Sequence, residues 1–155
     1  MEGFIDADWA SCIDDRRSYT GYAFLLAGAA ILWGSKRQKT VALSSTEAEY
    51  MALSEGTKEA IYLQSFLQET GIKSSTTKLY NDNQGAGQLI KNPVFHSRTK
   101  HIDIRHHFIR KANEEKKIDP KYIGTEEMTA DIQTKALPPA KHNFCVTALG
   151  ISDGD

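Results

Sequence analysis

Ser44-Ser45-Thr46-Glu47-Ala48-Glu49-Tyr50 opens the periodic segment that decides the fold, and the segment continues without proline to Gly71. Two overlapping capping boxes, Ser44 with Glu47 and Thr46 with Glu49, are typical of a helix N-terminus. At about 100° per residue, Glu49 falls on the same stripe as the small and apolar residues Ala52, Leu53, Gly56, Ala60, Leu63 and Leu67. The pattern predicts a long helix over 44–71 that carries an acid on its core-facing side, where a carboxylate is costly unless compensated.

Three apolar stretches before this helix predict the beginning of a sheet. Residues 4–9 have the composition of a short strand, and a charged polar turn follows them. Residues 19–26 and 30–35 are apolar, aromatic-rich runs on either side of a turn of small residues, as in a β-hairpin. Because consecutive strands usually pair, we expect three antiparallel neighbours.

The second half of the chain alternates between strand and helix patterns. We predict strands at 78–81 and 118–123, and helices at 84–90, 99–116, 128–137 and 140–150. The resulting order β-β-β-α-β-α-α-β-α indicates one α/β domain, in which helices flank a five-stranded mixed sheet. We assign this domain to residues 1–151 and expect a frayed tail at 152–155.

Composition restricts the class of protein. A chain of 155 residues that is 40% hydrophobic and 25% charged suits one globular domain. The uncharged stretch 21–34 is shorter than the roughly 20 residues of a membrane-spanning helix, and the acidic N-terminus is unlike a secretory signal. We therefore expect an intracellular protein without a membrane partner. Its two cysteines are far apart and indicate neither zinc nor a disulfide framework.

The net charge of −1 conceals an uneven distribution of charge. Residues 91–121 contain nine Lys or Arg against four Asp or Glu, together with four of the five histidines. Such a segment favours contact with phosphates, although a solvated surface is an equal alternative. We expect Trp9 and Trp33 to pack in the core.

Four acids stand where carboxylates are unusual: in an apolar strand, on a core stripe, at a strand end and on an inner helix face. Each has an alternative explanation as a turn cap, a capping-box partner or a helix-dipole acid. Together they would repel one another and raise their pKa values, a conflict that divalent cations relieve. Two ions about 4 Å apart support phosphodiester hydrolysis. The four acids are Asp6, Glu49, Asp82 and Asp131.

Six ordered sequence blocks carry a family resemblance: FIDADWA (4–10), DRRSYTGY (15–22), VALSSTEAEY (41–50), LYNDNQ (79–84), TKHIDI (99–104) and ADIQTKAL (130–137). Together they resemble the ribonuclease H domain of copia-type (Pseudoviridae) LTR retrotransposon polyproteins. The resemblance runs from about residue 4 to residue 149. It implies a ribonuclease H fold and hydrolysis of the RNA strand of RNA/DNA hybrids during reverse transcription.

The resemblance also implies roles for individual residues. Asp6, Glu49, Asp82 and Asp131 would be catalytic and would hold two Mg²⁺ ions, with Mn²⁺ as a substitute. Asp8 competes for the first role, because it lies two residues from Asp6 on the same strand face. The implied partners are the hybrid and the reverse transcriptase domain of the same polyprotein, inside a cytoplasmic virus-like particle. We expect the isolated domain to be monomeric.

Substrate contacts are carried over by position. Ser45, Thr46 and Gln84 match residues that touch the RNA backbone in cellular members of the superfamily, where contacts to 2′-hydroxyls distinguish RNA from DNA. In the basic segment, Lys100, His101 and Arg105 are candidates for neutralising phosphates.

The chain departs from cellular enzymes in the loop 122–127, which has no histidine where they usually place one for proton transfer. Either the role is dispensable, or Glu126, Glu127 or a histidine of the basic segment takes it. A catalytically weak or inactive nucleic-acid-binding domain that supports a reverse transcriptase is the alternative function. A related nuclease that cuts DNA is a third.

Overall fold

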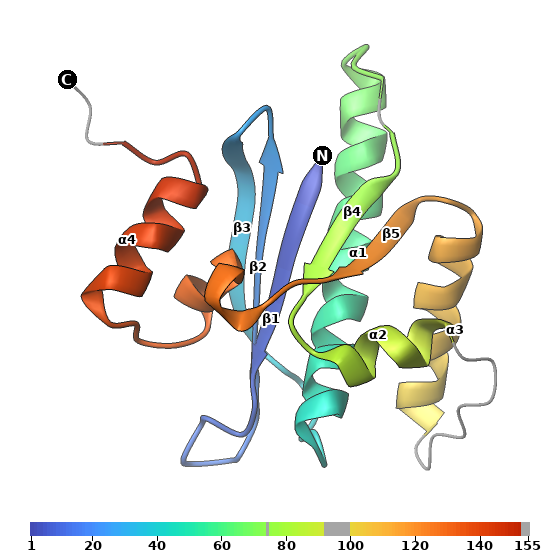
Figure 1. Ribbon diagram of the computed structural model, residues 1–155. Coiled ribbons are helices and arrows are strands. Elements are labelled where there is room, and N and C mark those ends of the chain that lie inside the picture. Colours follow the sequence, from blue (N-terminus) through green and yellow to red (C-terminus); the bar gives the residue numbers. More distant parts are fainter. Residues whose placement is uncertain (74, 92–99, 153–155) are drawn as a thin grey trace.

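A five-stranded mixed sheet forms the centre of the protein (Figure 1). The computed structural model describes residues 1–73, 75–91 and 100–152, and only the backbone of Leu89, Lys91, Lys100 and His101. Residues 153–155 of the predicted tail at 152–155 therefore lie outside the described residues. The strand order is β3-β2-β1-β4-β5, in which β1 pairs antiparallel with β2 and parallel with β4. The strands are β1 (Glu2–Asp8), β2 (Tyr19–Leu26), β3 (Ala29–Arg37), β4 (Thr77–Asn81) and β5 (Ile118–Tyr122).

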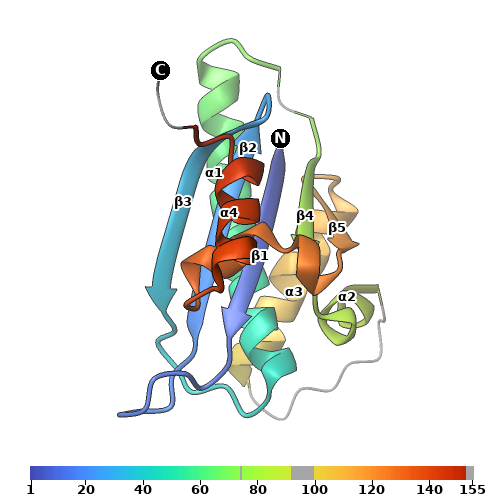
Figure 2. The same cartoon turned by 60° about the vertical axis from the view of Figure 1, so that its left-hand side comes forward.

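Helices cover both faces of the sheet (Figures 1 and 2). The long helix α1 and helix α3 lie on one face and enclose the main core with β1, β2 and β4. Helix α4 and two short 3₁₀ helices lie on the other face, over a smaller cluster around Ala23, Leu25 and Leu149. The predicted mixed sheet and its flanking helices are thus confirmed. The helices are α1 (Ser45–Glu69), α2 (Gln84–Lys91), α3 (Lys100–Glu114), η1 (Thr125–Glu127), η2 (Thr129–Gln133) and α4 (Pro139–Ala148).

One predicted helix has a different form. Residues 128–137 do not make an α-helix: η2 ends at Gln133, and Thr134 to Pro138 are not helical. Threonines at both ends of η2 are weak helix formers, and Pro138-Pro139 prevents a continuation. The segment containing Asp131 is therefore a short turn of 3₁₀ helix packed on the sheet.

The beginning of α1 uses one of the two predicted capping boxes. The Ser44 hydroxyl accepts a hydrogen bond from the Glu47 amide at 3.1 Å, and the Glu47 carboxylate accepts one from the Leu43 amide at 2.8 Å. The reciprocal bond thus reaches one residue further back than in the standard box. Glu49 forms no such cap and turns toward the sheet, where it accepts from the Ala7 amide.

A glycine brings α1 close to the central strand. A Cβ atom added to Gly56 would lie 2.0 Å from Cδ1 of Ile5, so only glycine allows this approach. Ile5 is fully buried and is the neighbour of Asp6 in β1. The close contact between helix and strand therefore fixes the position of Glu49 relative to Asp6.

Both tryptophans are more exposed than predicted: Trp9 at 49% and Trp33 at 61%. Trp9 follows β1, and its indole N–H donates to the Ala42 carbonyl oxygen at 3.2 Å. Trp33 lies on the edge strand β3 opposite Ala23 of β2, and the residues of β3 alternate between exposed and half-buried. Aromatic composition predicted the strand correctly but not which of its faces is covered. Among the described residues, no helix has the length and apolar character required to cross a membrane.

Candidate active site

Three acids from distant parts of the sequence converge at the carboxyl ends of β1 and β4. Asp6 belongs to β1, Glu49 to the second turn of α1, and Asp82 follows β4 directly. One carboxylate oxygen from each residue lies within 4.8 Å of the other two. Because β1 and β4 are parallel neighbours, their carboxyl ends meet at one edge of the sheet. Asp6 and Glu49 are almost fully buried, with 1% and 5% exposure, whereas Asp82 is half-buried.

Neutral groups hold Glu49 in place. The Asn81 side-chain amide donates to its Oε2 at 2.8 Å, and the Ala7 backbone amide donates to its Oε1 at 3.2 Å. Burial raises the pKa of Glu49 to about 9, and the nearby Asp6 carboxylate adds to the increase. No lysine or arginine pairs with Glu49 in the described part of the chain. The charged form of Glu49 would therefore lack a protein cation as partner in this part of the chain.

Asp6 has partial compensation. Burial raises the pKa of Asp6 to about 6, although the Thr134 hydroxyl and the Lys135 ammonium group both favour the charged form. The Thr134 hydroxyl donates to Oδ2 of Asp6, and Nζ of Lys135 lies 3.5 Å from the same oxygen. Asp82 receives a hydrogen bond from the Thr125 hydroxyl at 2.8 Å. Residues on both sides of η2 thus contact the acids: Thr125 before it contacts Asp82, and Thr134 and Lys135 after it contact Asp6.

Asp131 lies beside this trio without joining it. It is buried in η2, but it does not belong to the group of mutually close ligand atoms found among the described residues. Two lysines face it instead: Nζ of Lys135 is 2.8 Å from Oδ1, and Nζ of Lys141 is 3.5 Å from Oδ2. The sequence analysis missed both lysines. The available signal was the i,i+4 spacing of Asp131 and Lys135 in the ADIQTKAL block.

Gly21 allows η2 to approach the sheet. A Cβ atom added to this glycine of β2 would lie 2.6 Å from Cγ2 of Thr134 and 2.8 Å from Cβ of Gln133. Since Gly21 pairs with Asp6 across β1 and β2, this contact places the Asp131 segment next to the trio.

The donor set fits a divalent cation. The trio offers carboxylate oxygens only, and Mg²⁺ and Mn²⁺ prefer such hard ligands. Two of the three acids are buried near one another, and burial raises their pKa values, so a bound cation would relieve an electrostatic cost. Asp8 is not a member of the trio within the described ranges. The geometry therefore favours Asp6 over Asp8.

The residues predicted to touch RNA lie at two helix starts. Ser45 is exposed and Thr46 half-buried at the start of α1, and Gln84 is exposed at the start of α2. A Cβ atom added to Gly85 would lie 3.4 Å from the Thr46 hydroxyl, so the two helix starts are adjacent. They flank the strand end that carries Asp82.

Of the three residues predicted to neutralise phosphates, the structure describes the side chain of Arg105 alone. The side chains of Lys100 and His101 lie outside the described residues. Arg105 pairs with Glu55 of α1 at 3.2 Å and lines a cavity of about 210 Å³. Four further cations line this cavity: Lys36, Arg37, Lys39 and Lys58.

The loop 122–127 offers exposed carboxylates at Glu126 and Glu127, and the Thr125 hydroxyl already bonds to Asp82. Of the histidines in the basic segment, His106 is buried and stacks on Tyr50 with a centroid distance of 5.7 Å. His107 is exposed and lies 3.7 Å from Asp103 on the same helix. His106 therefore has a packing role.

Comparison with known proteins relates the chain to transposon polyproteins. It is 46% identical over 151 residues to the retrovirus-related Pol polyprotein from transposon TNT 1-94 of Nicotiana tabacum, a match that covers 97% of this chain and 11% of the relative. It is 39% identical over 153 residues to the Pol polyprotein from transposon RE1 of Arabidopsis thaliana, covering 98% of this chain and 10% of the relative. The chain thus spans about a tenth of the length of these relatives. No family model matches it.

Solved structures confirm the fold. LC11-RNase H1, isolated from compost and solved in complex with RNA/DNA hybrid, superposes with a TM-score of 0.63 at 14% identity, covering 86% of this chain and 92% of that one. The RNase H domain of rv2228c from Mycobacterium tuberculosis gives 0.60 at 15% identity, covering 96% of each chain. As the sequence blocks predicted, the chain is a homologue of a segment of the retrovirus-related Pol polyproteins of plant transposons and has the ribonuclease H fold.

Proposed function

We propose that this chain is a ribonuclease H that hydrolyses the RNA strand of RNA/DNA hybrids during reverse transcription of a retrotransposon. The observation that carries the proposal is the convergence of Asp6, Glu49 and Asp82 at one edge of a ribonuclease H sheet. The homologous transposon polyproteins supply the context of reverse transcription.

The chain's own residues would prepare the site. Asp6, Glu49 and Asp82 would hold divalent ions, with Asp131 as the fourth ligand. When bound, two Mg²⁺ or Mn²⁺ ions activate water for attack on a phosphodiester and stabilise the departing oxygen. The Asn81 amide fixes the orientation of Glu49. The Thr125 hydroxyl does the same for Asp82, the half-buried member of the trio.

Substrate contacts would follow the helix starts and the basic surface. Ser45, Thr46 and Gln84, which lie at the starts of α1 and α2, would hydrogen bond to the RNA backbone. Arg105 and the lysines beside it would attract phosphates further along the duplex, together with Lys100 and His101. If they do, hybrid affinity should fall steeply as salt rises, and a flat response in an electrophoretic shift assay would remove this part of the proposal.

The test is cleavage of a labelled RNA/DNA hybrid with Mg²⁺, Mn²⁺ or a chelator. Only the RNA strand should be cut, and the chelator should stop the reaction. Asp82→Asn should reduce the rate by at least about 10³-fold, since it removes a carboxylate from the charged reaction centre. Asp8→Asn removes the same charge two residues from Asp6 and serves as the matched control, with a rate within a few-fold of the parent.

A catalytically weak binding domain that supports a reverse transcriptase is the second candidate. It is favoured by the two lysines that already pair with Asp131 and by the loop without histidine. Hybrid binding without cleavage under either metal would establish it. Preferential cutting of duplex DNA would instead indicate a DNA nuclease, and single-stranded RNA serves as the remaining control.

A further inference from the structure

The ammonium group of Lys135 lies between two buried carboxylates. Its Nζ is 2.8 Å from Oδ1 of Asp131 and 3.5 Å from Oδ2 of Asp6. Both acids are at least 97% buried, with exposures of 1% and 3%. Lys135 therefore links an acid of the trio, Asp6, to the acid outside it, Asp131.

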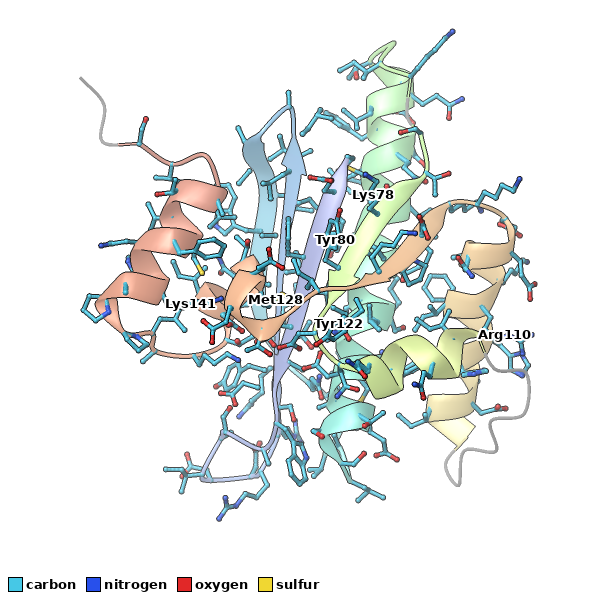
Figure 3. The ribbon with its side chains drawn as sticks, viewed as in Figure 1. Lys78, Tyr80, Arg110, Tyr122, Met128 and Lys141 are labelled. Atoms are coloured by element: carbon cyan, nitrogen blue, oxygen red, sulfur yellow. The ribbon has the colours of Figure 1, made fainter. Side chains whose placement is uncertain are left out.

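A second lysine nearby is bound differently. Nζ of Lys141 donates to the backbone carbonyl oxygens of Thr125 and Glu126 at 2.8 and 2.6 Å, and it lies farther from Asp131. Its side chain is only 16% exposed, and Figure 3 shows it extending from α4 beside Met128. Lys141 thus joins α4 to the loop before η2. Moving it would remove one hydrogen-bond donor from each of these two carbonyl groups.

Lys135 has no such attachment. In the described structure the partners of its Nζ are the two carboxylates, and its side chain is 38% exposed. Its stem has four methylene groups and can rotate toward solvent without breaking a backbone contact. An ammonium group held by carboxylates alone can be replaced by any cation that those carboxylates bind more strongly.

We propose that Lys135 occupies the cation position between Asp6 and Asp131 in the metal-free protein, so that a second divalent ion can bind these acids only by displacing its ammonium group. This inference rests on the proposed function, and it assigns Lys135 a positioning role rather than a catalytic one. Among the described residues no lysine pairs with Glu49 or Asp82, so the trio of Asp6, Glu49 and Asp82 takes the first ion. The second ion must compete with the ammonium group of Lys135 for Asp6 and Asp131.

Direct measurement of metal binding tests the proposal without reference to cleavage. We would titrate the protein with Mn²⁺ and count free ions by electron paramagnetic resonance. The parent should bind one ion tightly and a second weakly. Lys135→Gln should bind the second ion at least about tenfold more tightly, because the competing charge is gone. Lys135→Arg, which keeps the charge, should resemble the parent.

Controls separate the possible results. Lys117→Gln removes an equal charge from a lysine that pairs with Glu115, and it should leave Mn²⁺ binding unchanged. Asp82→Asn should weaken the first ion. Unaltered affinity for the second ion in folded Lys135→Gln would overturn the inference while leaving the proposed function intact. Failure of the parent and of every variant to bind Mn²⁺ would overturn both.

Discussion

The acids of the candidate site stand on two regions that are built differently. Asp6 and Glu49 belong to an inner wall, defined here as β1 with α1, where a strand and a long helix share the main core. Asp131 belongs to an outer arm, defined as η1, η2 and α4, which consists of short turns and one helix. In the described residues no lysine or arginine pairs with Glu49 of the wall, and Asp6 has only the partial compensation of Lys135, whereas two lysines pair with the acid of the arm.

This difference separates two ways of positioning a carboxylate. In the wall, packing fixes the side chains and leaves an electrostatic cost that a bound ion would relieve. In the arm, ion pairs and hydrogen bonds both position the carboxylate and neutralise its charge. Changes in the wall should therefore act mainly on stability, and changes in the arm mainly on the geometry of the site.

The largest expected effect is the pH dependence of stability without metal. The pKa of Glu49 is about 9 in the folded protein and near 4.5 when unfolded, so the folded state binds more protons in between. Raising the pH from about 5 to 8 should lower the free energy of unfolding by up to about 1.4 kcal/mol per pH unit. Asp6, with a pKa of about 6, adds to the slope at its acidic end.

Urea unfolding in a chelator at several pH values measures this slope. Glu49→Gln should flatten it, and so should saturating Mg²⁺ in the parent. Glu126→Gln, which changes an exposed acid, should leave it intact. Equal slopes for the parent and Glu49→Gln would show that the wall does not hold an uncompensated carboxyl group.

Packing within the wall should give the next largest effect. Gly56→Ala places a methyl group 2.0 Å from Cδ1 of Ile5 and should cost about 1–2 kcal/mol, since overpacking outweighs the better helix propensity of alanine. Ile5→Val removes that Cδ1. The double variant should therefore be more stable than the sum of the single changes predicts, and strict additivity would contradict the proposed contact.

The arm should respond less in stability than in activity. Gly21→Ala pushes against Thr134 and Gln133, and we expect it to cost about 1 kcal/mol, because η2 can shift outward. That shift moves Asp131 and should reduce hybrid cleavage about tenfold. Gly124→Ala, at a position with open space around the added carbon, is the matched control. Unchanged cleavage by Gly21→Ala would show that the arm need not sit close to β2.

The smallest effect is expected at the hydrogen bond between the arm and Asp82. Thr125→Val preserves shape and removes the hydroxyl that donates to Asp82, at a cost of about 0.5 kcal/mol. Cleavage should fall a few-fold while the KM for hybrid stays constant. Thr147→Val, another exposed threonine change, should alter neither quantity. A change in KM alone would assign Thr125 to substrate binding.

The wall was predictable from sequence, and in the arm so were helix α4 and the burial of Asp131, but the form of η2 was not. Hydrophobic periodicity placed Glu49 on the inner side of its helix, and strand order placed Asp82 at a strand end. In the arm, residues 128–137 were predicted as an α-helix because local patterns do not show that Gly21 leaves room for a tight 3₁₀ turn. Nor could spacing along the chain reveal that the ammonium group of Lys135 reaches Asp6 as well as Asp131.

The hydrogen bond between Thr134 and Asp6 also bears on how the protein folds, because 128 positions of the sequence separate its partners. Asn81 and Ile5, which hold the other side of the site, are 76 positions apart. Contacts between residues that are so far apart in the sequence form slowly, because much of the chain must be organised before the two partners can meet. During synthesis the acids would remain scattered until the final third of the domain had emerged, and tight ion binding would then report that folding is complete.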